Sequence, residues 1–342
     1  MAKIAINGFG RIGRAFLKLA LTKPELEVVA INDLGELDNL AYLLKYDSAY
    51  GRYDKKIETK EKDGKKHLIV DGHDILFLQE KDPVLLPWGV LEIGVVIEAT
   101  GVFDSFEKAA VHQKAGAKRV VISAPAKDED GAIGQTVLMG INEDNLKTCS
   151  ISSNGSCTTN SVSPVMQILV EKLGIQKAFL NTTHSYTATQ SLIDSAVKGG
   201  DWKRGRAAAA NISPSNTGAA IATTRAVKAL KGKFDGVSMR VPTITGSLSC
   251  IVFCSPKTTS VDELNNIFKE AEKEERWKGI LKTSDEQIVS SDIVGDPYAA
   301  TVDLGLTKVV DGDLCAVFSW YDNEFGYTNT LVEHVIKAAK FL

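Results

Sequence analysis

Residues 3–13 read KIAINGFGRIG, and this stretch decides how the first half of the chain folds. It begins as a short apolar strand, passes through a glycine-rich turn and leads into a helical run that ends near Pro24. A second apolar strand, residues 27–33, closes with Asp33, about 20 residues after the last glycine of the turn. Strand, glycine turn, helix and strand of this length are typical of a dinucleotide-binding unit, so we predict a Rossmann-type domain.

Each glycine of the turn has its own physical task. Gly8 permits the tight turn, Gly10 lets the backbone approach a pyrophosphate, and Gly13 lets the helix pack close to the strand. The free N–H groups at the start of the helix then bind the phosphates. Asp33 can accept hydrogen bonds from both ribose hydroxyls and would repel a 2′-phosphate, and Leu34 offers such a phosphate no hydroxyl. These residues predict NAD as the cofactor.

The strand–helix alternation continues beyond this unit. Residues 95–101 read as a buried strand, 105–115 as a helix and 118–125 as another strand. Such alternation predicts a mostly parallel, doubly wound sheet with its ligand at the carboxyl ends of the strands. Thr100 and Ser123 lie at such ends and are candidate cofactor contacts, although small residues are equally typical of plain turns there.

Antiparallel strands are expected in two other regions. Turn signals at Asp63-Gly64 and Asp71-Gly72 divide residues 53–77 into hairpins inserted in the first sheet. Residues 237–256 and 309–320 alternate apolar and polar side chains, which predicts a mixed or antiparallel sheet in the second half. The fold class is therefore α/β, with a Rossmann-type domain and an α+β domain.

Composition excludes several classes of protein. The chain of 342 residues has a formal net charge of −3, so no global field recruits nucleic acid or an anionic membrane. Its five cysteines form no CxxC pair, so we expect neither a disulfide framework nor a metal site. No apolar run reaches the roughly 18 residues of a membrane span, and no leader is expected. Free thiols suit a reducing compartment, so we expect a cytoplasmic protein.

One cysteine has an unusual setting. Residues 153–160 read SNGSCTTN and place Cys157 between a short strand and a helix. Unpaired N–H groups at a helix start favour a thiolate, so this position is expected to lower the thiol pKa. His184 closes the strand 178–184, where it could take the proton of a nearby thiol. A buried structural Cys and a satisfied structural His remain the alternatives from position alone.

Long motifs throughout the chain resemble those of the phosphorylating glyceraldehyde-3-phosphate dehydrogenases. The resemblance covers essentially the whole sequence, with the motifs in the family's order, which makes the match very specific. In chain order, the motifs are INGFGRIGR (6–14), YDS (46–48), ATGVF (99–103), ISAPAK (122–127), SNGSCTTN (153–160), THSYT (183–187), RGRAAA (204–209), SNTGAA (215–220), MRVP (239–242) and WYDNEFGY (320–327).

The resemblance implies a function. Cys157 would be the nucleophile that attacks the aldehyde carbon of D-glyceraldehyde 3-phosphate, and His184 the base that activates the thiol and then deprotonates the thiohemiacetal. Oxidation by NAD would leave a thioester, and attack by inorganic phosphate would release 1,3-bisphosphoglycerate, a step of glycolysis and gluconeogenesis. A thioester retains much of the oxidation free energy, which suits a Cys to this chemistry. We therefore expect an NAD-dependent, phosphorylating aldehyde dehydrogenase.

The reaction needs two anion sites and a cofactor site. The resemblance implies that Thr187 and Arg240 bind the substrate phosphate, with Arg204 as a further forked donor. Residues lining the attacking-phosphate site would be Ser156, Thr158, Thr217 and Gly218. Cofactor-binding candidates are Gly8, Gly10, Arg11, Ile12, Gly13, Asp33, Thr100, Ser123, Asn323 and Tyr327. Asn323 resembles the residue that hydrogen-bonds the nicotinamide carboxamide.

The family pattern also implies the organisation of the chain. Residues 1–156 with 323–342 would form the NAD-binding domain, because the last helix resembles one that returns to the cofactor domain. Residues 157–322 would form the catalytic domain. The polar loop 185–210 resembles one that packs between subunits, so a homotetramer is implied.

Three departures from the pattern concern this chain. Gly155 and Ser161 stand where many members carry Ala and a second Cys, so we expect no disulfide between Cys157 and an internal partner. The Leu-Pro pair of strictly NAD-using members is missing near Asp194-Ser195-Ala196. With Asp33 retained, the expectation is NAD preference with some NADP use.

Two rival functions remain open from the sequence. An erythrose-4-phosphate dehydrogenase would be a close relative, although residues 186–190 and the intact Thr217-Gly218 pair favour the phosphorylating reaction. A secondary RNA-binding or scaffold role would be a function of another class, but the chain lacks a basic stripe. We expect no nucleic-acid partner.

Overall fold

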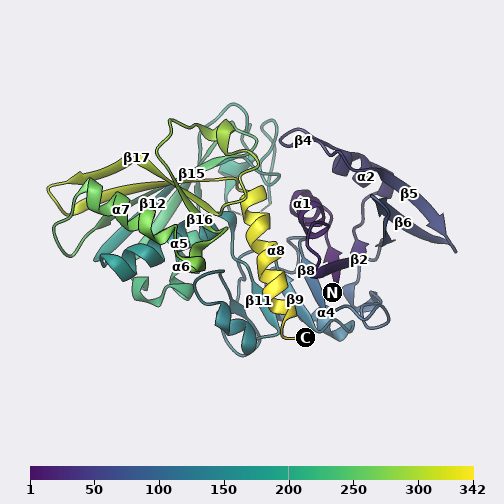
Figure 1. The fold of residues 1–342 in the computed structure, drawn as a ribbon. Helices are drawn as coiled ribbons and strands as arrows, with labels where there is room; N and C mark the ends of the chain where they lie inside the picture. Colours follow the sequence, from purple (N-terminus) through teal and green to yellow (C-terminus); the bar gives the residue numbers. More distant parts are fainter. Residues whose placement is uncertain (199) are drawn as a thin grey trace. The chain divides into compact units, whose positions relative to one another are not determined.

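The computed structural model describes residues 1–198 and 200–342, which form two compact units (Figure 1). The first unit contains both ends of the sequence. It comprises residues 1–137, 142–155 and 331–342, and the second comprises 138–141 and 156–330. The division expected from sequence differs mainly at 323–330, which belong to the second unit rather than to the first.

Within the described residues, the first unit contains a sheet of nine strands. They are β1 (Ala2–Asn7), β2 (Leu26–Asn32), β5 (Ile57–Lys62), β6 (Lys65–Val70), β7 (His73–Leu78), β8 (Val95–Glu98), β9 (Arg119–Ile122), β10 (Gln135–Thr136) and β11 (Ile151–Ser153). Their order is β10-β11-β9-β8-β1-β2-β7-β6-β5. The pairs from β10 to β7 are parallel, and β7-β6-β5 are antiparallel. The doubly wound sheet with its inserted hairpins is confirmed.

The central strands are apolar because both of their faces are covered. Residues Ile4 to Ile6 of β1 and Val95 to Ile97 of β8 have no exposed surface. The connections include α1 (Arg11–Ala20), α2 (Leu37–Lys45), α3 (Phe106–Ala109) and α4 (Val111–Lys114), and a two-stranded sheet joins β3 (Tyr46–Asp47) to β4 (Gly51–Arg52). Instead of the single helix expected over 105–115, the chain forms the two consecutive short helices α3 and α4.

The hairpins follow from their turn residues. Asp63-Gly64 joins β5 to β6 and Asp71-Gly72 joins β6 to β7, and all four residues have φ between 51° and 88°. Two consecutive residues with positive φ make the turn that matches the twist of the flanking strands. Asp-Gly pairs therefore set both hairpins, as the sequence predicted.

The second unit contains a mixed sheet of seven strands in the described chain. They are β12 (Lys177–Ser185), β13 (Ser213–Asn216), β14 (Phe234–Val241), β15 (Ser247–Cys254), β16 (Leu281–Ser284), β17 (Ala300–Val310) and β18 (Leu314–Tyr321). The order is β13-β14-β12-β15-β18-β17-β16. Strand β12 is parallel to β14 and antiparallel to β15, so the mixed sheet expected from the alternating pattern is confirmed.

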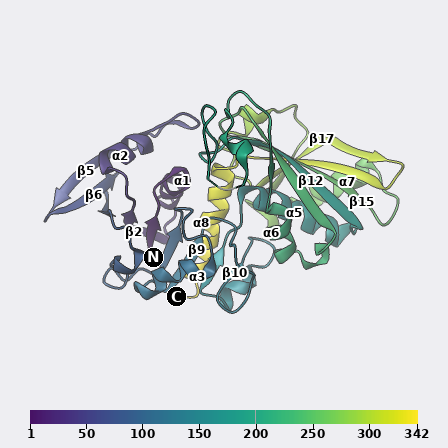
Figure 2. The same cartoon turned by 180° about the vertical axis from the view of Figure 1, so that it is seen from behind.

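A layer of helices covers this sheet. Helices α5 (Cys157–Lys172), α6 (Ala219–Ala226) and α7 (Val261–Ala271) contact the strands, and α5 contacts the other two helices (Figures 1 and 2). Helix α8 (Phe325–Ala339) begins in the second unit and ends in the first. Its start is held by Asp322, whose Oδ1 accepts from the N–H groups of Glu324 and Phe325, both at 2.9 Å. Of the helices in the described residues, none has the length and apolarity to cross a membrane.

Candidate active site

Helix α5 begins at Cys157, as the sequence predicted. Strand β11 ends at Ser153, and Gly155 turns the chain with a φ of 65°, a left-handed conformation that glycine adopts without strain. Ser156 is the N-cap, and its hydroxyl accepts from the N–H of Thr159 at 3.1 Å. The thiol is thereby placed on the first residue of the helix.

The thiol lies next to a histidine ring. The Sγ of Cys157 and the Nε2 of His184 are 3.3 Å apart. His184 lies near the end of β12 and is 2 % exposed. A thiol and an imidazole nitrogen at this distance can exchange a proton, which is the arrangement of an activated nucleophile and its base. The structure thus brings together the two residues that the sequence proposed as catalytic.

The other nitrogen of His184 has two competing partners. Its Nδ1 is 2.6 Å from the carbonyl oxygen of Ser185 and 2.7 Å from Nη1 of Arg240, which is itself 3.1 Å from that carbonyl. A guanidinium only donates and a carbonyl only accepts, so Nδ1 can satisfy one of them at a time. When Nδ1–H donates to Ser185, Nε2 is free to accept the thiol proton.

Burial and charge set the protonation states of the pair. Burial, assisted by the positive charge of Arg240, lowers the pKa of His184 to about 3, so the ring is neutral at neutral pH. Burial raises the pKa of the Cys157 thiol, although Arg240 and hydrogen bonding by Thr158 oppose it. This reverses the direction expected from the helix start alone, because desolvation of the thiolate outweighs the local N–H groups. The pair therefore favours a neutral thiol beside a neutral imidazole.

Sequence reasoning assigned no role to Tyr321, although it lies in one of the motifs. Its hydroxyl is 3.0 Å from Oγ1 of Thr158 and 2.8 Å from Oγ1 of Thr182, and the side chain is buried. Its ring meets that of His184 edge to face, with centroids 6.0 Å apart and planes at 74°. Tyr321 thus supports both the histidine and the threonine that follows the nucleophile. The motif around 320–327 signalled the site but not this contact.

The residues expected to bind anions fall into two groups by their contacts. Arg240 lies beside His184, because the two residues are paired in the register of β14 and β12. Arg204, half-exposed, donates to Thr189 at 2.7 Å and to Ser215 at 3.0 Å, and forms an ion pair with Asp201 at 3.2 Å. Arg204 is therefore oriented by protein acceptors.

The threonines expected in these anion sites have local partners. The hydroxyls of Thr187 and Thr189 are 2.9 Å apart. Thr217 accepts from the N–H of Ala219 at 3.2 Å, and Gly218 begins α6 as an N-cap without a side-chain cap. The exposed start of α6 therefore offers N–H groups to an anion. Among the described residues, the hydrogen bonds of Thr187 and Thr217 are local and do not reach Cys157, so the roles expected for Thr187, Thr217 and Gly218 stay predictions.

Asn323 is oriented by a cluster of donors. Its Oδ1 lies within 3.2 Å of the hydroxyls of Ser185, Thr245 and Ser247 and of the N–H of Gly246. An amide oxygen surrounded by donors leaves the NH₂ group to face other partners. This orientation suits Asn323 to donate to a carbonyl oxygen such as that of a carboxamide. Sequence reasoning found Asn323 but missed its three hydroxyl partners.

The glycine turn of the first unit has the shape required for a dinucleotide. Gly8 has a φ of 98°, and a Cβ there would lie 2.6 Å from the backbone nitrogen of Thr100. A Cβ on Gly13 would lie 2.1 Å from the carbonyl oxygen of Gly8. On Gly10, which precedes α1, a Cβ would meet no atom within 4 Å, and no side chain caps the helix. The turn is thus tightly packed on one side and open on the side where a pyrophosphate would bind, so these residues fit a dinucleotide.

Asp33 lies against the same turn. Its Oδ2 accepts from the N–H of Phe9 at 2.6 Å and its Oδ1 from the N–H of Gly35 at 2.8 Å. Arg11 donates to Asp47 at 2.8 Å, which directs its guanidinium toward a protein carboxylate. These contacts orient Asp33 beside the phosphate turn, as the ribose-binding role requires.

The remaining cofactor candidates are divided between the units. Ile12 lies in α1, while Thr100 follows β8 and Ser123 follows β9, so these three belong to the first unit. Tyr327 lies in α8 and belongs, like Asn323, to the second unit. No cluster of His, Cys, Asp and Glu within residues 1–198 and 200–342 could hold a metal ion.

Comparison with known proteins gives a consistent result. Residues 2–106 match the family model described as the NAD binding domain of glyceraldehyde 3-phosphate dehydrogenase, and residues 156–323 match the model of its C-terminal domain. A glyceraldehyde-3-phosphate dehydrogenase of Clostridium pasteurianum is 45% identical over 99% of this chain and 100% of its own length. Proteins of the same name from Geobacillus stearothermophilus and Nostoc sp. are 44% and 43% identical, over 97% of this chain and 96% and 95% of their own lengths.

Proposed function

This chain belongs to the glyceraldehyde-3-phosphate dehydrogenase family, and from that premise we propose that it oxidises D-glyceraldehyde 3-phosphate with NAD and inorganic phosphate to 1,3-bisphosphoglycerate. The observation that carries the proposal is the distance of 3.3 Å between Sγ of Cys157, at the start of α5, and Nε2 of His184. Such a pair is suited to covalent chemistry at a carbonyl carbon.

The first step needs a proton acceptor for the thiol. His184 is neutral, and donation from its Nδ1 to Ser185 leaves the Nε2 lone pair directed at Sγ. The thiol proton moves to Nε2, Sγ attacks the aldehyde carbon, and the carbonyl oxygen takes the proton back from Nε2, which gives a thiohemiacetal at Cys157 and a neutral His184. The positive charge of Arg240 favours the thiolate as it develops.

The second step oxidises that carbon. His184 accepts the proton of the thiohemiacetal hydroxyl, and loss of a hydride from the carbon leaves a thioester on Cys157. When bound, NAD supplies the hydride acceptor for this oxidation. The glycine turn and Asp33 would hold its pyrophosphate and adenosine ribose, and Asn323 would donate to its carboxamide.

The third step transfers the acyl group to phosphate. An oxygen of inorganic phosphate attacks the thioester carbon, the C–S bond breaks, and the thiolate of Cys157 leaves. Ser156, Thr158, Thr217 and Gly218 would hold the attacking phosphate. Support comes from the open start of α6 and from the hydroxyl of Tyr321 that orients Thr158.

The substrate phosphate would bind to Thr187 and Arg240, and Arg204 would contribute a further positive charge. The support is the place of Arg240, whose Nη1 lies 2.7 Å from Nδ1 of His184, and the positive charge of both arginines, which helps to lower the pKa of His184. We propose residues 1–156 with 323–342 as the NAD-binding domain and 157–322 as the catalytic domain. NAD would be preferred, with some use of NADP.

The assembly would be a homotetramer. Four large apolar side chains among the described residues of the segment 186–212 are exposed in the single chain, as a subunit interface would require. They are Leu192, Ile193, Trp202 and Ile212. We further propose a cytoplasmic location, to which the five free cysteines are suited. A net charge of −3 supports the expectation that no nucleic acid is bound.

A steady-state assay tests the reaction. Oxidation of glyceraldehyde 3-phosphate is measured with NAD or NADP, with and without phosphate, and erythrose 4-phosphate serves as the rival substrate. We expect phosphate-dependent turnover with NAD and a lower kcat/KM for NADP and for the rival. The variant His184→Asn should retain NAD binding and lose about 10²- to 10⁴-fold in kcat. Turnover that does not depend on phosphate would overturn the phosphorylating reaction.

A further inference from the structure

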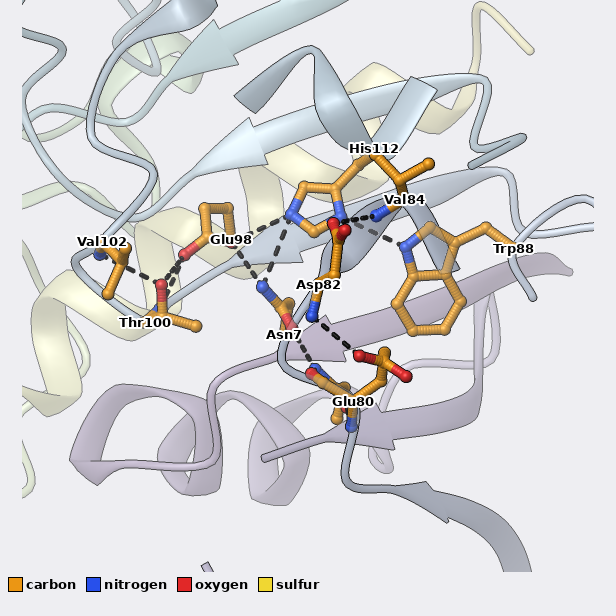
Figure 3. Close-up of polar contacts among 10 residues, drawn as sticks. Asn7, Glu80, Asp82, Val84, Trp88, Glu98, Thr100, Val102 and His112 are labelled. Carbon is orange, nitrogen blue, oxygen red and sulfur yellow. Dashed lines mark hydrogen bonds and ion pairs between the residues drawn. The ribbon is translucent and has the colours of Figure 1, made fainter. Parts of the chain in front are cut away.

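A buried polar network crosses the carboxyl edge of the sheet in the first unit (Figure 3). Its centre is the carboxyl group of Glu98, the last residue of β8. One oxygen, Oε2, is 2.6 Å from Nδ2 of Asn7 and 2.9 Å from Nε2 of His112. The other, Oε1, accepts from the N–H of Thr100 at 2.8 Å and also contacts the hydroxyl of that threonine. Glu98, Asn7 and His112 are at most 1 % exposed.

One end of the network has its polarity fixed by the backbone. The N–H of Glu80 donates to Oδ1 of Asn32 at 2.8 Å, and the carbonyl of Glu80 accepts from Nδ2 of Asn32 at 2.9 Å. That amide nitrogen also donates to Oδ1 of Asn7 at 2.8 Å, which leaves Nδ2 of Asn7 as the donor to Glu98. The orientations of both asparagine amides thus follow from one peptide group.

The other end has its polarity fixed by an indole. Nε1 of Trp88 lies 3.2 Å from Nδ1 of His112. An indole N–H only donates, so Nδ1 must be the acceptor and the ring proton of neutral His112 must lie on Nε2. That proton points at Oε2 of Glu98. Trp88, which has no exposed surface, therefore selects the tautomer of His112.

Three donors therefore meet the carboxyl group of Glu98. They are Nδ2 of Asn7, Nε2 of His112 and the N–H of Thr100. A carboxyl group can meet donors on both oxygens, whereas an amide would present its own donors to one of them. Position 98 therefore requires a glutamate. Its neighbours Asn7, His112 and the N–H of Thr100 are fixed as donors by other groups or by the backbone, and only the hydroxyl of Thr100 can change its role. The side chains of Asn7, Asn32, Glu98, His112 and Trp88 are buried, whereas the end of the network at Thr100 is exposed.

That exposed end contacts the phosphate turn. Asn7 directly precedes Gly8, and the N–H of Gly8 donates to the carbonyl of Asn32 at 2.8 Å. Gly8 also packs directly on Ala99 and Thr100, since a Cβ on it would come within 2.8 Å of three of their backbone atoms. Glu98 holds both sides of this contact, through Asn7 on one side and Thr100 on the other.

We propose that Glu98 and His112 are positioning residues of the dinucleotide site, and that Trp88 acts on that site by fixing the tautomer of His112. This inference rests on the proposed use of NAD. The network sets where the Gly8 turn and Thr100 lie before the cofactor binds, so its loss costs cofactor affinity rather than the chemical step. If the network only stabilised the core, its loss would lower the stability of the protein and leave its affinity for NAD unchanged.

The experiment compares variants in which a hydrogen-bonding group of the network is exchanged, kept or removed with little change in side-chain size. Glu98→Gln keeps the shape and introduces donors opposite donors. His112→Gln keeps one acceptor for Trp88 and one donor for Glu98, and His112→Leu removes both. Trp88→Phe removes the indole N–H. Trp277→Phe is the matched control, because Trp277 is equally buried and its Nε1 has no partner among the described residues.

The dissociation constant of NAD is measured by direct titration of each folded variant, with the melting temperature recorded in parallel. We expect Glu98→Gln and His112→Leu to raise Kd about tenfold, Trp88→Phe to raise it about threefold, and His112→Gln and Trp277→Phe to stay within about twofold. KM for NAD should follow Kd, whereas kcat and the KM of the aldehyde should remain within about twofold.

Two results would overturn the proposal: an unchanged Kd in Glu98→Gln and Trp88→Phe whatever their melting temperatures, or a loss in His112→Gln as large as in His112→Leu. If His112→Leu does not fold, the contrast between Glu98→Gln, Trp88→Phe and Trp277→Phe decides. Failure of the proposed function is distinguishable, because the wild-type chain would then show no NAD binding or no aldehyde oxidation, whereas failure of this inference leaves both intact.

Discussion

Nη1 of Arg240 lies 2.7 Å from Nδ1 of His184, closer than it lies to the carbonyl oxygen of Ser185. The guanidinium therefore acts on the proposed base as well as being suited to bind a phosphate. Its charge helps to lower the pKa of His184 to about 3 and opposes the rise in the pKa of Cys157 caused by burial. An anion that draws Arg240 toward itself would leave Nδ1 to Ser185 and Nε2 to the thiol.

Replacing Arg240 tests this double role. Arg240→Leu should raise the KM of glyceraldehyde 3-phosphate by about 100-fold, because the charge-assisted contact that we propose between this guanidinium and the phosphate would be lost. The pKa of His184 should rise, since the charge that lowers it is gone. Steady-state kinetics with phosphorylated and unphosphorylated glyceraldehyde measure the effect. A KM that changes equally for both aldehydes would remove Arg240 from the phosphate site.

Tyr321→Phe should weaken the attacking-phosphate site without abolishing catalysis. The substitution leaves the hydroxyls of Thr158 and Thr182 without their shared partner, which costs about 1 kcal/mol of stability. Thr158 becomes free to rotate, so the KM of phosphate should rise a few-fold while the KM of NAD is unchanged. Denaturant unfolding and a phosphate titration of the initial rate are the measurements. An unchanged KM of phosphate would contradict the orienting role.

Stability should fall in acid because of His334. Its Nε2 is 2.7 Å from the hydroxyl of Ser152 and its Nδ1 is 3.0 Å from Oδ1 of Asn154, and burial lowers its pKa to about 3. The unfolded chain binds a proton near pH 6.5 and the folded chain does not, so the stabilisation is complete above that pH and is lost toward pH 3. His334→Gln should flatten this dependence relative to wild type in denaturant unfolding between pH 7 and 4. Parallel curves for the two proteins would exclude the contribution of His334.

Oxidation of Cys157 should not produce an internal disulfide. Position 161, one helical turn after Cys157, is a buried serine whose hydroxyl is 3.5 Å from that of Ser319. Peroxide treatment followed by peptide mass spectrometry should find Cys157 as an oxyacid or a mixed disulfide. The variant Ser161→Cys places a thiol within reach and serves as the positive control. A link between Cys157 and another native cysteine would show the expectation to be wrong.

Local sequence signals were sufficient for much of the fold. The glycine turn, the Asp-Gly hairpins and the start of α5 were predictable because each depends on a few adjacent residues with strong conformational preferences. The helix expected over 105–115 is divided at Ala110, which lies between α3 and α4, and no sequence signal at this alanine predicted the division. Residues 323–330 group with the second compact unit and helix α8 crosses the division, so the domain boundary expected at 323 stays a prediction.

The site was predictable in its residues but not in its electrostatics. Cys157 and His184 were named from motifs, yet their separation depends on the packing of α5 against β15, β17 and β18 of the sheet that contains β12. The pKa of Cys157 was expected to fall, and the structure raises it, because burial of a side chain depends on the whole fold. The contacts of Tyr321 and Glu98 join residues far apart in the sequence, so no local pattern could reveal them.

The covalent role of Cys157 is the central claim, and mass spectrometry of the acylated enzyme tests it most directly. The enzyme is mixed with glyceraldehyde 3-phosphate and NAD in the absence of phosphate, quenched in acid and digested. We expect an acyl adduct on the peptide containing Cys157, its loss on addition of phosphate, and no adduct in Cys157→Ser. An adduct on another residue, or steady turnover by Cys157→Ser at the wild-type rate, would contradict the account.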